Sequence, residues 1–172
     1  PGRRRPDDRG EGAGRRHLDR LTITGGNGTG DDGPGGVDAR EATKLQMHGV
    51  HIVGNTGLHG GGLALYEVRA TLEDVRIEAN TATGGGGAWL ARSIVECSDS
   101  AFADNEAEHG GGFWLQGPNS ISDCTLTANS AATGGGVFVE AGGDAILTDV
   151  RIEDSVATER GGGLYQTDST VT

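Results

Sequence analysis

Hydrophobic positions recur along the chain at an almost constant interval, and runs of glycine mark the same interval. The last glycine of each run before a hydrophobic residue lies 24 to 27 residues after the previous one, and these glycines are Gly36, Gly62, Gly87, Gly112, Gly136 and Gly163. A repeat of this length indicates a solenoid, in which each repeat forms one coil and stacks on its neighbours.

Three columns of mainly apolar residues appear when the repeats are aligned on an asparagine. The residue three places before it is Ile23, Ile52, Ile77, Phe102, Leu126 or Ile152. The second column lies two places before the first and consists of Leu21, Val50, Val75, Ser100, Cys124 and Val150. The third lies five places before the first and consists of Leu18, Met47, Leu72, Cys97, Ile121 and Leu147. A spacing of two is strand alternation, and a spacing of three requires a bend. We expect all three columns to face inward.

Strand-like triplets follow the glycine runs, with the outer members expected inside and the middle one outside; they are 63–65, 88–90, 113–115 and 137–139. Three short strands per repeat cannot pair within one coil, so they must pair with the coils on either side. The pattern predicts an all-β, single-stranded right-handed parallel β-helix over residues 18–172, with about six coils of roughly 25 residues. Residues 1–17 are Arg- and Gly-rich, which indicates a basic arm without regular structure.

Two polar columns accompany the apolar ones. The asparagines precede the last glycine by seven residues and are expected to stack as a structural ladder, weakened where Gly26 and Ser155 replace them; they are Asn55, Asn80, Asn105 and Asn129. The aspartates stand at the bend and are Asp74, Asp99, Asp123 and Asp149. Asp stabilises turns by bonding nearby backbone, which is the preferred interpretation, with Arg76 and Arg151 near enough to offset repulsion. The alternative is a Ca²⁺ site; otherwise we predict no cofactor and no metal.

The pattern apolar-x-x-Asn-x-small-x-x-Gly-Gly-Gly-apolar occurs at 77–88, 102–113 and 126–137. It resembles the repeat of chlamydial polymorphic outer-membrane proteins over about residues 18–170, and it is similar more widely to the pectate-lyase-like β-helix group. The resemblance implies a secreted or surface-displayed protein, often adhesive. It also implies little about chemistry, because lyases, hydrolases, adhesins and filament proteins share β-helices.

Charge is segregated along the chain. The net charge is −11, yet residues 1–20 hold seven Arg against four acidic residues, so this part carries +3 and the remainder −14. An acidic body repels nucleic acid and anionic membranes, so neither is an expected partner, and the segment has no run suited to membrane insertion. Because the chain starts at Pro1 and ends inside a repeat, we expect it to belong to a longer protein.

Few residues suggest chemistry. Lys44 is the single lysine, Asp31 and Asp32 form one adjacent acidic pair, and no carboxylate constellation accompanies His59 or His109, so we predict no catalytic residues. Both histidines are interpreted as turn residues. Cys97 and Cys124 lie in adjacent coils but three positions apart in register, which predicts two buried thiols and no disulfide.

The outward middle positions of the glycine-following strands carry a stripe of aromatic residues in successive coils: Trp89, Trp114, Phe138 and Tyr165, after Ala64. Contiguous exposed aromatics mark an interface or a ligand platform. Three interpretations stay open: ring stacking between coils, a protein interface, or a platform for glycans.

The predicted function combines these features. The coil ends expose unpaired strand edges, and the basic arm, with Arg3, Arg4, Arg5, Arg15 and Arg16, would lie on an acidic neighbour. We expect an extracellular or cell-surface structural and adhesive protein that associates head to tail with itself into a filament or array, with surface glycans as further partners. The alternatives are a polysaccharide lyase or hydrolase, and a non-catalytic glycan-binding module.

Overall fold

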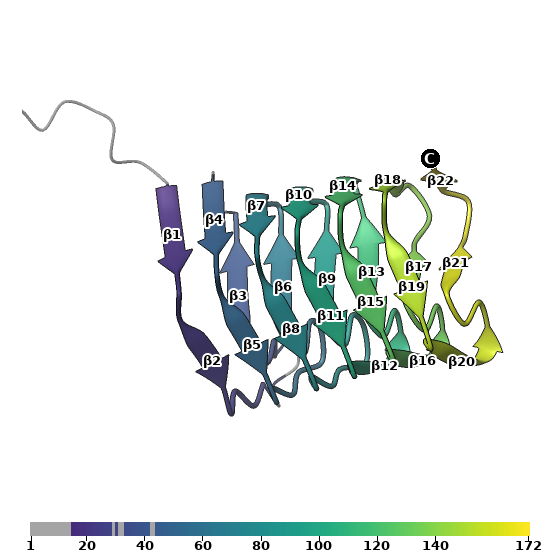
Figure 1. Cartoon of the computed structure of the whole chain (residues 1–172), viewed down its shortest axis with the longest axis horizontal. Helices are drawn as coiled ribbons and strands as arrows, with labels where there is room; N and C mark the ends of the chain where they lie inside the picture. Colours follow the sequence, from purple (N-terminus) through teal and green to yellow (C-terminus); the bar gives the residue numbers. More distant parts are fainter. Residues whose placement is uncertain (1–14, 29, 31–32, 42–43) are drawn as a thin grey trace, which may run out of the picture.

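The structure, a computed structural model, describes residues 15–28, 30, 33–41 and 44–172, and these form a parallel β-solenoid of about six coils (Figure 1). Every strand pairs in parallel with the strand one coil away, and the described residues form no helix. Consequently none of them forms a helix that is long and apolar enough to cross a membrane. The predicted fold is confirmed.

Four sheets run along the solenoid axis. Sheet A contains β1 (Arg15–Asp19), β4 (Lys44–His48), β7 (Arg69–Glu73), β10 (Ile94–Ser98), β14 (Pro118–Ser122), β18 (Asp144–Thr148) and β22 (Thr170–Val171). Sheet B contains β2 (Thr22–Thr24), β5 (His51–Val53), β8 (Arg76–Glu78), β11 (Ala101–Ala103), β15 (Thr125–Thr127) and β19 (Arg151–Glu153).

Sheet C is short and was not predicted; it contains β12 (Glu106–His109), β16 (Ser130–Thr133) and β20 (Val156–Arg160). Sheet D follows the glycine runs and contains β3 (Val37–Arg40), β6 (Leu63–Tyr66), β9 (Ala88–Ala91), β13 (Phe113–Gln116), β17 (Val137–Val139) and β21 (Leu164–Gln166). In earlier coils the position of sheet C holds only isolated bridges, such as Thr56 with Thr81.

The three predicted columns line one continuous core. Ile52, Ile77, Phe102 and Leu126 are fully buried in sheet B, and they pack against the inward residues of sheets A and D. The Phe102 and Phe113 rings lie 4.0 Å apart between their centroids. In the first and last coils the same columns are only partly buried, because neighbouring coils cover them on one side; examples are Leu18, Ile23, Leu147 and Ile152.

The asparagine ladder forms as predicted. The Nδ2 atoms of Asn55, Asn80 and Asn105 each donate to Oδ1 of the next asparagine at 3.0 Å. Each backbone N–H also donates to the same Oδ1 atom. The ladder changes at both ends. In the first coil Gly26 has no side chain, and only its backbone N–H donates to Asn55 Oδ1. In the last coil the Ser155 hydroxyl donates to the Glu153 carbonyl instead of joining the ladder.

Close backbone contact explains the glycine runs. A Cβ atom added to Gly86 would lie 2.5 Å from the carbonyl oxygen of Glu106 and 2.7 Å from that of Gly111, both in the next coil. Such distances are below van der Waals contact, so only glycine allows the coils to stack at the spacing of a sheet. Gly86 therefore serves the close packing of neighbouring coils.

The solenoid begins earlier than the predicted boundary at residue 18. Strand β1 starts at Arg15 and pairs with β4, so Arg15 and Arg16 belong to sheet A and not to an arm. The three arginines proposed for the arm, Arg3, Arg4 and Arg5, lie outside the described residues.

Candidate binding groove around Trp89

The aromatic stripe lies on the outer face of sheet D. Register pairs Trp89 with Trp114, Trp114 with Phe138, and Phe138 with Tyr165. The ring centroids are 5.3, 6.5 and 5.8 Å apart in that order, and all three pairs are stacked. The expectation of a broadly exposed stripe is wrong for its middle, because Trp114 is 8% exposed and Phe138 is 9% exposed. Each ring is covered by its neighbours, so stacking between coils explains most of this stripe.

Trp89 differs from the other tryptophan because small residues adjoin it. It is half-buried, and its register partner on the other side is Ala64. In the next outward row, Ala91 lies between Tyr66 and Gln116. Aromatic rings nevertheless stack on the indole from both neighbouring coils: Trp114 from the next coil, and His59 and Tyr66 from the preceding one. Beside the indole, the small side chain of Ala91 leaves unfilled volume.

Two hollows occupy this volume. One of about 400 Å³ is lined by His59, Tyr66, Thr83, Gly84, Trp89, Ala91, Arg92, His109, Trp114, Gln116 and Glu140. The other, about 240 Å³, is lined by Arg40, His59, Tyr66 and Trp89. Because His59, Tyr66 and Trp89 line both, the two hollows adjoin, and together they are here called the Trp89 groove. Its size is within the range of small-ligand sites.

His59 is not only a turn residue. Its ring stacks on Trp89 with 4.9 Å between centroids. Its Nδ1 atom is buried and has no hydrogen-bond partner among the described residues. A buried polar atom without a partner costs free energy of folding. His109 also lines the groove, and its Nδ1 lies 2.6 Å from the Thr133 hydroxyl.

Charged side chains of both signs surround the groove. Arg92 donates to the Tyr66 hydroxyl at 3.0 Å and lies 3.6 Å from Glu67, and its guanidinium stands over the Tyr66 ring. Partial burial raises the pKa of the Glu140 carboxyl, and the nearby His109 opposes that shift. The groove thus offers an aromatic surface, a cationic donor and a carboxyl acceptor at its rim.

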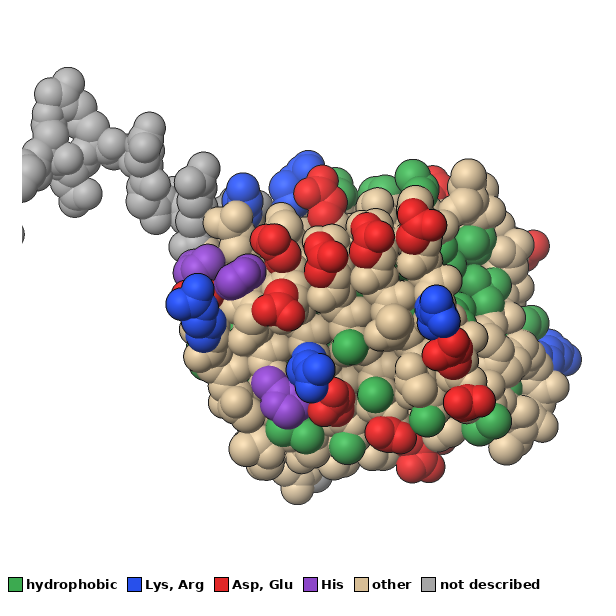
Figure 2. Space-filling model, in the orientation of Figure 1, with side chains coloured by type: hydrophobic (Ala, Val, Ile, Leu, Met, Phe, Trp, Pro, Cys, Tyr) green, Lys and Arg blue, Asp and Glu red, His purple; other side chains and the backbone are tan. Residues whose placement is uncertain are grey.

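The bend aspartates lie elsewhere, between sheets A and B. Asp74, Asp99, Asp123 and Asp149 all have φ between 51° and 52°, in the left-handed region that Asp tolerates better than most residues. They are exposed, and among the described residues their carboxylates accept no hydrogen bond, so backbone conformation accounts for them. Acidic side chains form a row on this face (Figure 2).

The fold does not bring the aspartates of this row together with other side chains that could bind a metal ion. No group of three His, Cys, Asp or Glu suited to a metal ion occurs within the described part of the chain. The arginines expected to compensate the row pair with glutamates instead, Arg76 with Glu78 at 3.7 Å and Arg151 with Glu153 at 3.1 Å. The Ca²⁺ interpretation therefore gains no support from this geometry.

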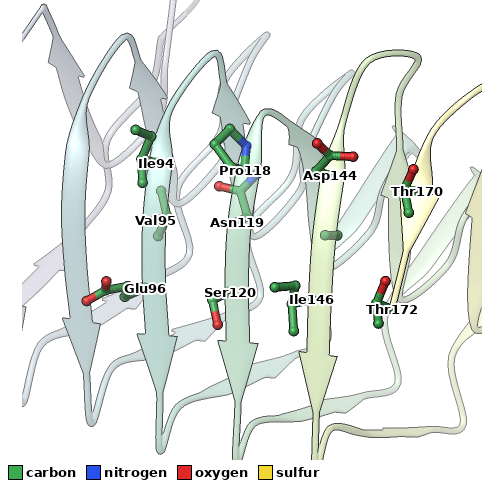
Figure 3. A pocket seen from close by; sticks show the side chains of 11 residues that line it. Ile94, Val95, Glu96, Pro118, Asn119, Ser120, Asp144, Ile146, Thr170 and Thr172 are labelled. Carbon is green, nitrogen blue, oxygen red and sulfur yellow. The ribbon is translucent and has the colours of Figure 1, made fainter.

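A third hollow, about 450 Å³, lies on the outer face of sheet A between β10, β14, β18 and β22 (Figure 3). In register, Ser120 lies between Glu96 and Ile146, which is 52% exposed, and Ile94, 38% exposed, lies two residues before Glu96 on β10. Its lining contains no aromatic side chain. It therefore has fewer groups suited to stacking on a flat ligand than the Trp89 groove has.

Comparison with known proteins gives one match. A family model described as a right handed beta helix region matches residues 10–171. No curated protein and no solved structure matches the chain.

Proposed function

Because the chain belongs to the right-handed β-helix family, we propose that it is a non-catalytic structural and adhesive protein of the cell exterior that binds a saccharide in the Trp89 groove. The single observation that carries the proposal is the half-buried indole of Trp89, which lies between two hollows with polar rims. The likeness of the repeat to that of chlamydial polymorphic outer-membrane proteins supports the location and the adhesive role.

The groove has the groups that a sugar requires. A sugar ring has an apolar face of C–H groups, which stacks on an aromatic ring, and a rim of hydroxyls, which need donors and acceptors. Trp89, Tyr66 and His59 supply an aromatic wall, Arg92 supplies donors, and Glu140 supplies an acceptor. A protein partner would need roughly 800 Å² of its own surface in contact, whereas two small hollows favour a small or thin ligand.

Replacement of Trp89 is expected to weaken binding. In a glycan array, Trp89→Ala should lower affinity for the bound sugar by about 30-fold, the loss typical of one dominant aromatic contact. Tyr165→Ala is the matched control, because Tyr165 belongs to the same stripe but lines neither hollow, and it should bind like the wild type.

Equal retention of the wild type and Trp89→Ala would contradict the proposed site, and a wild type that retains no glycan would reject saccharide binding. The competing interpretation is a polysaccharide lyase or hydrolase. Incubation with acidic polysaccharides, with and without Ca²⁺, distinguishes the two. Unsaturated products or new reducing ends would show that the protein is an enzyme and not a binding protein.

Self-association is a second candidate function, favoured by the terminal coils. Within the described residues, the end strands of sheets A, B and D and the last strand of sheet C pair on one edge only, and apolar residues beside them are partly uncovered. Val156 in β20, the last strand of sheet C, is 59% exposed. Free strand edges next to apolar side chains favour pairing with another chain.

Light scattering at rising protein concentration tests this candidate. The 172-residue chain is expected to form larger species head to tail, and Val156→Lys should suppress them, because charge at a sheet edge opposes pairing. Ile94→Lys, which places the same charge on the face of sheet A, is the control and should still associate. Single particles at all concentrations, in scattering and in electron micrographs, would exclude self-association.

A further inference from the structure

The two cysteines meet in the core although one lies in a strand of sheet A and the other in the bend between sheets A and B. Cys97 lies in β10 and is paired in register with Ile121 of the next coil. Cys124 lies three residues beyond Ile121, after the left-handed residue Asp123. The bend at Asp123 turns the chain, so both side chains point into the same inner corner. Their Sγ atoms are 3.8 Å apart.

This contact corrects one part of the sequence prediction. Both thiols are buried, as expected. The register offset, however, does not hold the sulfur atoms apart, since strands on the two sides of a bend converge on the interior. A disulfide requires about 2.05 Å between sulfurs, so the pair needs a further approach of less than 2 Å.

The surroundings favour a disulfide over a metal site. Structural zinc requires four ligands, and no third His, Cys, Asp or Glu joins the two sulfurs in the part of the chain that the structure describes. Ser100 occupies, in the coil of Cys97, the column position that Cys124 occupies in the next coil. Its hydroxyl donates to the Ser98 carbonyl at 2.7 Å. The two sulfurs are thus each other's nearest reactive partners.

We propose that Cys97 and Cys124 form a disulfide between neighbouring coils when the chain folds in the presence of a disulfide oxidant. The Cys124 thiolate attacks one sulfur of glutathione disulfide and releases one glutathione thiolate. The Cys97 thiolate then attacks the Cys124 sulfur of this mixed disulfide and releases the second glutathione. Two protein thiols are oxidised and one glutathione disulfide is reduced to two thiols, and the two protons that the protein thiols lose are taken up by the two released glutathione thiolates.

The hydrogen bond between the sulfurs is consistent with this order. The hydrogen bond that the two sulfurs share lowers the pKa of the Cys124 thiol and raises the pKa of the Cys97 thiol, and burial of Cys97 raises the latter further. Cys124 is therefore the thiol that ionises first. Because both sulfurs are inaccessible in the folded coil stack, the first exchange takes place during folding or on local opening.

The bond would clamp one whole coil. It would connect the sheet A strand of one coil to the start of the sheet B strand of the next, across 27 residues of chain. A closed loop of this size restricts the unfolded chain, so the oxidised protein should unfold at a higher temperature than the reduced protein.

Refolding of the full chain in glutathione redox buffer tests the proposal. The product is expected to lose about 2 Da relative to the reduced chain, to show a linked peptide pair containing positions 97 and 124, and to unfold about 8 °C higher. Reductant should reverse the mass change and the temperature shift. Cys97→Ala and Cys124→Ala should show neither change under the same conditions.

The mass measurement on the wild type is decisive even if a variant does not fold. Two free thiols in the folded protein after prolonged exposure to the oxidant would overturn the proposal. Glutathione adducts alone, or disulfides only between chains, would also overturn it. The result does not depend on whether the Trp89 groove binds a sugar.

Discussion

Asn105→Ala is expected to lower the free energy of unfolding by about 4 kcal/mol, because it removes the centre of the asparagine ladder and leaves buried polar groups unpaired. Asn105 Nδ2 donates to Asn129 Oδ1 and to the Ile77 carbonyl, and its Oδ1 accepts from the backbone and side chain of Asn80. Urea unfolding, followed by circular dichroism and by tryptophan fluorescence, measures the change. The two tryptophans lie in the coil of Asn105 and the coil before it, so they report local opening.

Asn119→Ala is the matched control for the ladder. Asn119 is equally buried, but it makes a single hydrogen bond, from Nδ2 to the Gly117 carbonyl, and its Oδ1 has no partner among the described residues. Its replacement should cost about 1 kcal/mol. Similar losses for the two variants would show that the ladder contributes no more than an ordinary buried amide.

Gly86→Ala is expected to destabilise the protein by about 4 kcal/mol, because the added methyl group would press on rigid backbone of the next coil. The methyl carbon would lie 2.5 Å from the Glu106 carbonyl oxygen and 2.7 Å from the Gly111 carbonyl oxygen. Relief requires the coils to separate, and separation would lengthen the nearby hydrogen bonds between them. The midpoint of thermal unfolding and the yield of folded protein measure the effect.

Gly30→Ala controls for the loss of a glycine as such. An added Cβ at Gly30 meets nothing within 4 Å, so its replacement should change stability by no more than about 0.5 kcal/mol. If Gly86→Ala unfolds at the same midpoint as the wild type, close stacking of the glycines is not what keeps them in the repeat.

The repeat made much of the fold predictable. When each coil carries the same residue at the same offset, stacking places like residues beside one another whatever the detailed path of the chain. The inward columns and the ladder from Asn55 to Asn129 follow from that rule alone. Sheet C could not be predicted from that rule. Its strands, such as Glu106–His109, have no alternating apolar pattern and pair only where successive coils align.

The candidate site was predictable only in part. The column of aromatic residues predicts Trp89, but the groove beside it depends on Ala91, whose small volume matters only beside its neighbours in other coils. The role of His59 was missed, because its ring reaches Trp89 from the preceding coil. Exposure of an outward side chain is a property of adjacent coils and cannot be assigned from one repeat.

The sequence by itself determined the coil period, the inward faces and the ladder of this protein, because each of these depends on a spacing repeated along the chain. Tertiary structure alone decided which aromatic ring borders open space, that Arg15 already pairs in sheet A, and that Cys97 meets Cys124. These outcomes depend on the direction in which each bend turns the chain and on the volume of neighbours one coil away. Both are three-dimensional quantities that residue spacing does not contain.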